Sequence, residues 1–162
     1  MNLESNLGLT NIWSVTCLDK DGNVKWAEEK KNLITTVGLN HILDTQFHAS
    51  TQVTTWYIGL KGSGTPVAGD TMASHSSWSE ITDYSGDRKE WTEGAASSGS
   101  MTNSSSVDFS VTGTATVAGA FLNTASTGTA GTLYGVVDFS SARSVISGDT
   151  LQVTVTVTAA SA

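Results

Sequence analysis

Ser74 and His75 lie in a stretch that holds the residue types of a serine hydrolase. Asp70 comes shortly before them and Glu80 shortly after. A catalytic triad is defined by how its side chains meet in space, so crowding in one glycine-rich stretch does not establish one. The sequence also has no nucleophile-elbow pattern. We therefore expect no catalytic residue here and no enzymatic activity in the chain.

Two further patterns could suggest a metal or a phosphate-bearing cofactor. His41 and His48 are seven residues apart and fit one side of a helix, but a zinc site needs three or four converging ligands. The glycine-rich run at residues 59–64 follows a strand-like stretch and precedes no helix-like one, unlike a phosphate-binding loop. The sequence thus predicts neither a metal nor a cofactor.

The acidic segment from Asp19 to Asn23 has two interpretations. Its alternating acidic and amide residues resemble the start of a calcium loop, but Lys30 stands where an EF-hand places its bidentate glutamate. An Asp-Gly pair between two strand-like runs, here residues 11–18 and 24–30, is a strong signal for a β-hairpin. We predict a hairpin at this position.

The overall composition indicates a structural protein. The chain has 162 residues, which suits one domain, and only 14% of them are charged, against about 25% in an average domain. The net charge of −7 and the scattered basic residues argue against a nucleic-acid partner. A single cysteine, Cys17, excludes an internal disulfide and fits folding in a reducing cytoplasm. No segment has the character of a membrane helix or a secretory signal, so we expect a soluble protein with no membrane partner.

Strand patterns dominate the second half of the chain. Residues 151–158 alternate leucine or valine with glutamine or threonine, as in a strand with one buried face. Residues 107–111 alternate in the same way, and residues 115–123 and 133–139 have the pattern of further strands. A run of Gly, Ser, Ala and Asn at residues 94–106 indicates a surface loop. We predict a mainly β fold: an antiparallel β-sandwich of the jelly-roll or immunoglobulin-like type.

One short α-helix is predicted near residues 36–47, where Thr35 or Thr36 can cap the start. Apolar residues at spacings of three and four would form one face of this helix. We expect that face to pack against the sandwich. It consists of Leu39, Ile42, Leu43 and Phe47.

The domain organisation is predicted to be simple. Residues 11–162 form a single β-sandwich domain, and residues 1–10 are a candidate N-terminal arm. The leucines Leu3, Leu7 and Leu9 have no evident partner strand, so we expect the arm to order only on a neighbouring subunit and to contact it.

The five tryptophans divide between packing and recognition. A large ring buries much apolar area, so core packing is the expectation for most of them. Trp78 and Trp91 lie in polar, loop-rich surroundings, and tryptophan is enriched at interface hot spots. We therefore expect these two to be exposed and to contact a partner, either a protein or a carbohydrate.

Several segments resemble a family of small structural proteins of tailed bacteriophages. The resemblance begins at residue 32 and extends to the carboxyl end, and its motifs bring no catalytic residues. The segments are NLITTVGLN (residues 32–40), WYIGL (56–60), AGDTMASH (68–75), GAFL (119–122), GTLYG (131–135) and SGDTL (147–151).

The resemblance implies a capsid cement or decoration protein, which binds the outer surface of the head and locks major capsid subunits together. Such a protein would be assembled in the host cytoplasm and located on the virion. Its partner would be the major capsid protein, and we expect a homo-oligomer, either a dimer or a trimer. The alternative is a phage tail or fibre module that binds a host-surface glycan.

Overall fold

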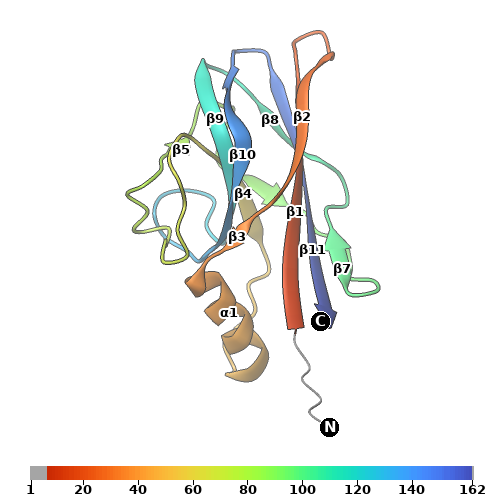
Figure 1. The fold of residues 1–162 in the computed structure, drawn as a ribbon, viewed down its shortest axis with the longest axis vertical. Coiled ribbons are helices and arrows are strands. Elements are labelled where there is room, and N and C mark those ends of the chain that lie inside the picture. Colours follow the sequence, from red (N-terminus) through yellow and green to blue (C-terminus); the bar gives the residue numbers. More distant parts are fainter. Residues whose placement is uncertain (1–6, 162) are drawn as a thin grey trace.

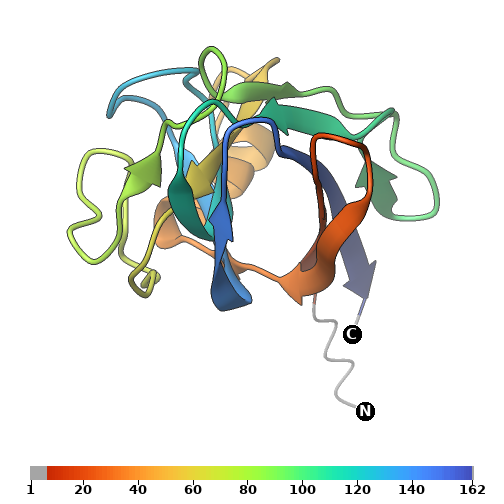
Figure 2. The same cartoon turned by 90° about the horizontal axis from the view of Figure 1, so that it is seen from above.

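A computed structural model describes residues 7–161 of the chain. It has two antiparallel sheets that pack face to face and one short helix, α1 (Thr36–Phe47), at one end of the molecule (Figures 1 and 2). The predicted fold class, a mainly β antiparallel sandwich with one helix near residues 36–47, is confirmed.

The first sheet is built around one long strand pair. Strands β1 and β11 run antiparallel from the pair Leu7 and Ser161 to the pair Leu18 and Thr150. The order is β2-β1-β11-β7. The short strands β7 and β8 both pair with β11, β8 with residues 150–153 and β7 with residues 156–158. The bounds are β1 (Leu7–Leu18), β2 (Val24–Lys31), β7 (Ser100–Thr102), β8 (Val107–Ser110) and β11 (Thr150–Ser161).

The second sheet has the order β3-β10-β9-β4-β5, and β6 pairs with β4 next to β5. Strands were predicted at residues 115–123 and 133–139, and β10 runs six residues further than predicted, to Val145. The bounds are β3 (Leu33–Ile34), β4 (Trp56–Lys61), β5 (Glu80–Ile81), β6 (Lys89–Trp91), β9 (Ala115–Asn123) and β10 (Leu133–Val145).

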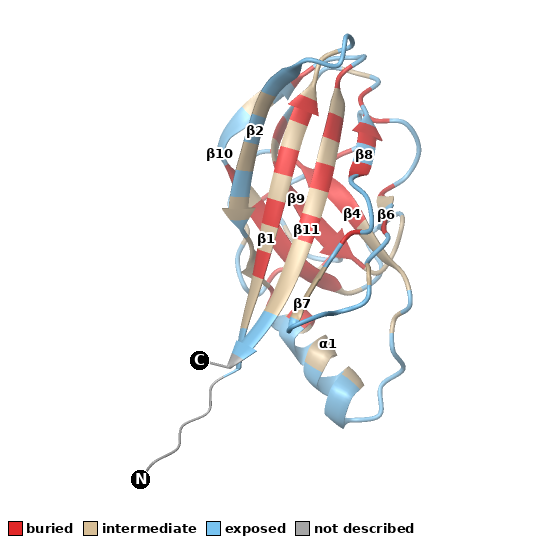
Figure 3. Ribbon diagram, turned by 90° about the vertical axis from the view of Figure 1, so that its right-hand side faces the viewer, coloured by how far each residue is buried: buried red, intermediate tan, exposed pale blue. Residues whose placement is uncertain are grey.

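The core lies between the two sheets. Alternate residues of β1 and β11 point inward, so buried and partly exposed positions follow one another along both strands (Figure 3). Trp13, Val15 and Cys17 are at most 1% exposed, and Ile58 and Leu60 face them from the second sheet. A fold of this size is held by such burial, because no disulfide is available to it.

The predicted hairpin is confirmed. β1 and β2 are joined by a tight turn in which Asp19 N–H donates to Asn23 O and Gly22 has a φ of 83°. The Asp19 carboxylate accepts from the side-chain amide and the backbone N–H of Asn23 and from the backbone N–H of Asp21. These bonds lower the pKa of Asp19. The turn's own donors thus occupy this carboxylate.

The helix forms as predicted, but its apolar face does not pack as predicted. The side chain of its N-cap, Thr35, accepts from Gly38 N–H, and Gly38 is the buried residue of the helix. An added Cβ at Gly38 would lie 2.3 Å from Tyr134 O, so the first turn touches β10 directly. From there the helix runs past the end of the sheet, which leaves Leu43 55% and Phe47 81% exposed. The expectation that the sandwich covers this stripe holds for Ile42, which packs against the core, and is wrong for Leu39, Leu43 and Phe47, which are exposed.

Residues 7–10 of the predicted N-terminal arm belong to the first sheet. Leu7 and Leu9 belong to β1 and pair with Ser161 and Ala159 of β11. The expectation that they lack a partner strand is therefore wrong, because the carboxyl-terminal strand extends far enough to pair with them. Leu3 lies outside the described residues. Within the described part of the chain, no helix is long and apolar enough to cross a membrane.

Candidate functional site

The loops that follow β4 and β9 gather on one side of the second sheet (Figures 1 and 2). Two surface depressions lie there, of about 480 Å³ and 160 Å³, and the side chain of Glu80 lines both. We call them together the loop-face cleft. The larger part is lined by Met72, Ala73, Ser74, His75, Ser76, Trp78, Ser79, Glu80 and Thr129, and the smaller part by Glu80, Thr82, Tyr84, Gly86, Asp87, Arg88, Ser126, Thr127 and Gly128.

Arg88 fixes the carboxylate at the centre of this cleft. Its guanidinium donates from Nε and Nη2 to the two oxygens of Glu80, both at 2.7 Å. It also donates to Ala125 O at 2.8 Å and to Gly128 O at 2.6 Å. The Arg88 side chain is only 2% exposed, so a charge-assisted network holds the loop at residues 124–131 against β5.

Trp78 forms the floor of the larger depression instead of standing exposed. It is 5% exposed and packs with Met72 and Phe121 in a second, smaller apolar cluster. Its Nε1–H donates to Asp70 Oδ2 at 2.9 Å, and the ring of His75 stacks on it at 4.0 Å. The expectation of an exposed Trp78 is wrong, because the loop folds back and supplies both a polar partner and a covering ring.

The serine-hydrolase residue types of this loop do not assemble into a triad. Asp70 accepts from Trp78 Nε1–H and from Val67 N–H, and His75 Nδ1 lies 3.2 Å from Trp78 O. The backbone N–H of Ser74 donates to Thr71 Oγ1 in a local turn. The acidic and histidine side chains therefore position Trp78, and within residues 7–161 no hydrogen bond joins either of them to Ser74.

Trp91 is buried as well, with 4% of its surface exposed. It sits on β6 opposite Trp56 of β4, so its ring points into the sandwich. Its Nε1–H donates to Asn103 Oδ1 at 2.6 Å. The expectation that Trp91 is exposed is wrong, because β6 is a strand of the second sheet and not part of a loop. A partner contact by Trp91 stays a prediction.

The other histidines do not form a metal site in the structure. The His41 ring meets the edge of Trp56 at 5.5 Å, and His48 lies 3.5 Å from Asp44 on the exposed end of the helix. Among residues 7–161, no group of three His, Cys, Asp or Glu side chains is placed to hold a metal ion.

One buried charge had no sequence signal. Lys61, at the end of β4, is 0% exposed and its Nζ lies 2.7 Å from Asp138 Oδ1 of β10. It also donates to Gly62 O and Gly64 O. In the sequence, Lys61 is followed by glycine and serine, which is typical of an exposed loop. Only the order of the strands in the sheet brings the Asp138 carboxylate next to it. This pair ties β4 to β10 across β9.

Leu7 and Leu9, the remaining candidate contact residues, lie at the opposite end from the hairpin. Leu7 is 74% exposed and Leu9 is half-buried, and both are on the strand face that points toward α1. They line an apolar groove, which is described below.

The fold is an antiparallel β-sandwich with two depressions on its loop face and an apolar groove at one end. The sequence profile of the family described as "Podophage GP4 fiber I protein gp80" matches residues 33–160. The chain therefore belongs to this family and is a phage structural protein. None of the curated proteins matches it significantly. The resemblance to phage structural proteins is confirmed at that level, and the family description favours the fibre alternative over capsid cement.

Proposed function

We propose that this chain is a fibre module of a phage particle and binds a neutral host-surface saccharide in the loop-face cleft. The cleft itself carries the proposal. It combines a hydroxyl-rich rim, the half-buried ring of His75, which stacks on the buried Trp78, and a fixed carboxylate at Glu80. Sugars present hydroxyl groups together with apolar C–H faces, so a saccharide site needs both polar and aromatic groups.

The charge of the cleft favours a neutral sugar over an anionic one. Two carboxylates, Glu80 and Asp87, line it against one cation, Arg88, whose side chain is only 2% exposed, and the whole chain carries a net charge of −7. An acidic glycan would meet like charge here. A carboxylate has about four acceptor positions, so Glu80 can accept sugar hydroxyls while it remains bonded to Arg88.

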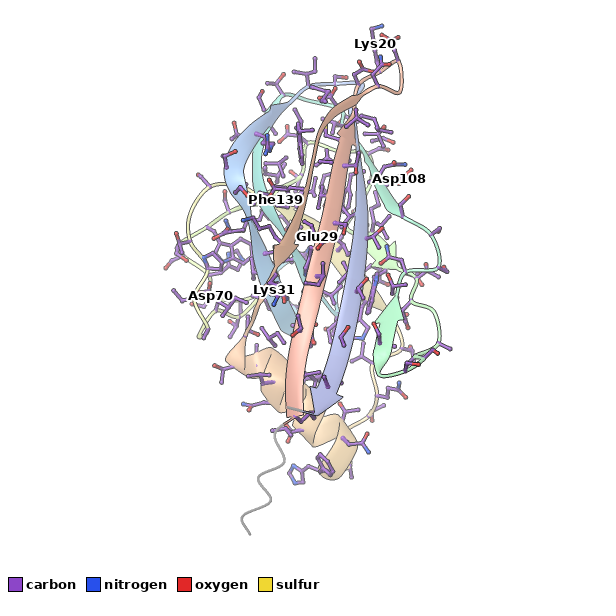
Figure 4. The ribbon with its side chains drawn as sticks, turned by 45° about the vertical axis from the view of Figure 1, so that its right-hand side comes forward. Lys20, Glu29, Lys31, Asp70, Asp108 and Phe139 are labelled. Atoms are coloured by element: carbon purple, nitrogen blue, oxygen red, sulfur yellow. The ribbon has the colours of Figure 1, made fainter. Side chains whose placement is uncertain are left out.

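The cleft is also preorganised. Arg88 fixes the loop at residues 124–131, and the bonds that Asp70 (labelled in Figure 4) accepts from Val67 N–H and Trp78 Nε1–H fix the loop on the other side. Ligand binding would thus cost little ordering entropy. The larger depression, at about 480 Å³, lies within the range of small-molecule sites. We propose that the chain acts by such binding and not by catalysis.

An array of immobilised neutral and sialylated oligosaccharides tests the proposal. We expect the purified protein to bind neutral members, and we expect Thr129→Trp, which places bulk on the exposed rim, to abolish that binding. Thr114→Trp changes an exposed threonine outside the cleft and should bind as the wild type does. The proposal fails if no neutral oligosaccharide is bound, or if Thr129→Trp binds as well as Thr114→Trp.

Glu80→Gln gives a second measurement, because it keeps the size of the side chain and removes its charge. Glu90, which is exposed on β6 outside the cleft, provides the matched control Glu90→Gln. Weaker binding only in Glu80→Gln, with thermal unfolding checked for both variants, supports a role for the carboxylate.

A cement protein and a fibre protein would be found at different places on the particle. A cement protein that locks major capsid subunits would be present in high copy on empty, tail-less heads. We propose the fibre role because the family description names a fibre. High-copy cosedimentation with tail-less heads would favour the cement role instead.

A further inference from the structure

The end of the molecule opposite the hairpin is open and apolar. Here β1 and β11 extend past the second sheet, and α1 stands apart from them (Figure 3). An inner depression of about 200 Å³ is lined by residues that include Leu9, Ile42 and Val157. An outer one of about 360 Å³ adds Leu7 and Phe47. We call the two together the end groove.

Exposed apolar side chains are concentrated at this groove. Seven large apolar side chains are exposed within residues 7–161, and four of them belong to α1 or to the start of β1. Contiguous apolar patches are uncommon on isolated soluble proteins and mark surfaces that another molecule covers. The four are Leu7, Leu39, Leu43 and Phe47, with exposures of 74%, 42%, 55% and 81%.

The helix cannot close the groove by folding against its own sheet. Its first turn is fixed, because Thr35 N–H and Oγ1 donate to the carbonyls of Tyr134 and Leu133. Gly38 touches the Tyr134 backbone so closely that no Cβ would fit. Since this anchor sets the direction of the helix, Leu43 and Phe47 are held out beyond the end of the second sheet.

Charge indicates what covers the groove. No Asp, Glu, Lys or Arg is among the described residues that line either depression. A strongly charged partner would find no complementary charge there. Two copies of a chain with a net charge of −7 repel each other over most of their surfaces, but they can meet at this neutral patch without desolvating charge.

The patch also combines exposed apolar side chains with a hollow. Leu43 and Phe47 line the outer depression and are 55% and 81% exposed, and the inner depression beside them can receive apolar side chains. A surface with both features can pair with the same surface of another copy. Residues 1–6, which the structure does not describe, include two large apolar side chains, Met1 and Leu3, which are few compared with the exposed stripe.

We propose that a second copy of this chain covers the end groove, so that the protein self-associates through α1 and the adjoining end of β1. This proposal is independent of saccharide binding, because the loop-face cleft and the end groove share no lining residue.

Sedimentation velocity over a wide concentration range tests the proposal on the full chain. We expect the wild type to be an oligomer, and we expect Phe47→Ser and Leu43→Ser to weaken self-association by roughly thirtyfold or more, as truncation of a hot-spot residue does. Both side chains are exposed, so the variants should keep the wild-type unfolding temperature. Val24→Ser and Ile146→Ser remove side chains that are 63% and 51% exposed outside the groove and should leave the oligomer intact.

Three results would overturn the proposal. The first is a wild type that stays monomeric at every concentration. The second is an oligomer that persists in both groove variants. The third is a monomer whose binding of the apolar dye ANS rises when residues 1–6 are deleted, since the terminal segment would then be the occupant. Saccharide binding by a monomeric Phe47→Ser variant would show that saccharide binding does not depend on self-association.

Discussion

Asn103 should be far more important for stability than its place in a Gly/Ser/Asn-rich stretch suggests. It is 8% exposed, and its side-chain oxygen accepts from Trp91 Nε1–H at 2.6 Å and from Val155 N–H at 2.8 Å. Its amide nitrogen donates to Val153 O at 2.9 Å. β8 pairs with β11 up to Val153, and β7 pairs with it from Thr156 onward. The Asn103 amide therefore fills the gap that these two short strands leave in the ladder.

Asn103→Ala removes all three hydrogen bonds. At about 1 kcal/mol net for each bond, the expected loss of stability is about 3 kcal/mol. This is a lower bound, because the Trp91 indole and the two backbone groups of β11 are left without their partner in a buried site. For a chain of this length each kcal/mol lowers the melting temperature by about 2–4 °C, so we expect a decrease of roughly 6–12 °C.

Thermal and urea unfolding followed by circular dichroism measure this effect. The matched control is Ser104→Ala, which removes an exposed hydroxyl bonded to Thr92 O and should change stability by no more than about 0.5 kcal/mol. Asn103→Asp gives a second measurement. It keeps an acceptor for Trp91 and Val155 but replaces the Nδ2 donor by an oxygen that faces Val153 O, so it should also lower the melting temperature relative to the wild type. A melting temperature of Asn103→Ala equal to that of Ser104→Ala would refute the idea that this amide completes the sheet.

Three further predictions follow from buried groups. Burial raises the pKa of the Cys17 thiol, so Ellman's reagent should label it slowly in the native protein and fully in denaturant; fast native labelling would contradict its place in the core. Burial also raises the pKa of Tyr84 above its ordinary value of about 10, so the folded state keeps this proton and loses stability as the pH rises above that value. Tyr84→Phe should flatten the alkaline decline in melting temperature, and an unchanged decline would contradict the assignment. Gly59→Ala places a Cβ 2.3 Å from the Phe121 ring and should cost about 1–3 kcal/mol in urea unfolding, whereas Gly69→Ala, with open space around it, should not.

The sequence determined the local elements because their signals are local. Alternating Val and Thr residues define β11, since a strand with one buried face needs that period whatever lies opposite it. The Asp-Gly pair defines the hairpin because the turn uses a positive φ at Gly22. Thr35 marks the start of α1 through a bond to a residue three positions away. Ser74 and His75, and the acidic residues at 19–23, are close in sequence, but closeness in sequence does not by itself predict a triad or a metal loop.

Tertiary structure decided what each element faces, and so which of the described candidate side chains are exposed. Trp78 and Trp91 lie in polar sequence surroundings but are buried, because Asp70 and Asn103, eight and twelve residues away, fold back to accept from their indole N–H groups. Lys61 is buried because the sheet order brings Asp138, 77 residues later in the chain, next to it. In the opposite sense, most of the α1 stripe stays exposed although its period suits burial, because the anchor at Gly38 directs the helix past the end of the sheet. A period in the sequence specifies which side chains share a face, whereas the presence of anything against that face depends on contacts between residues far apart in the chain.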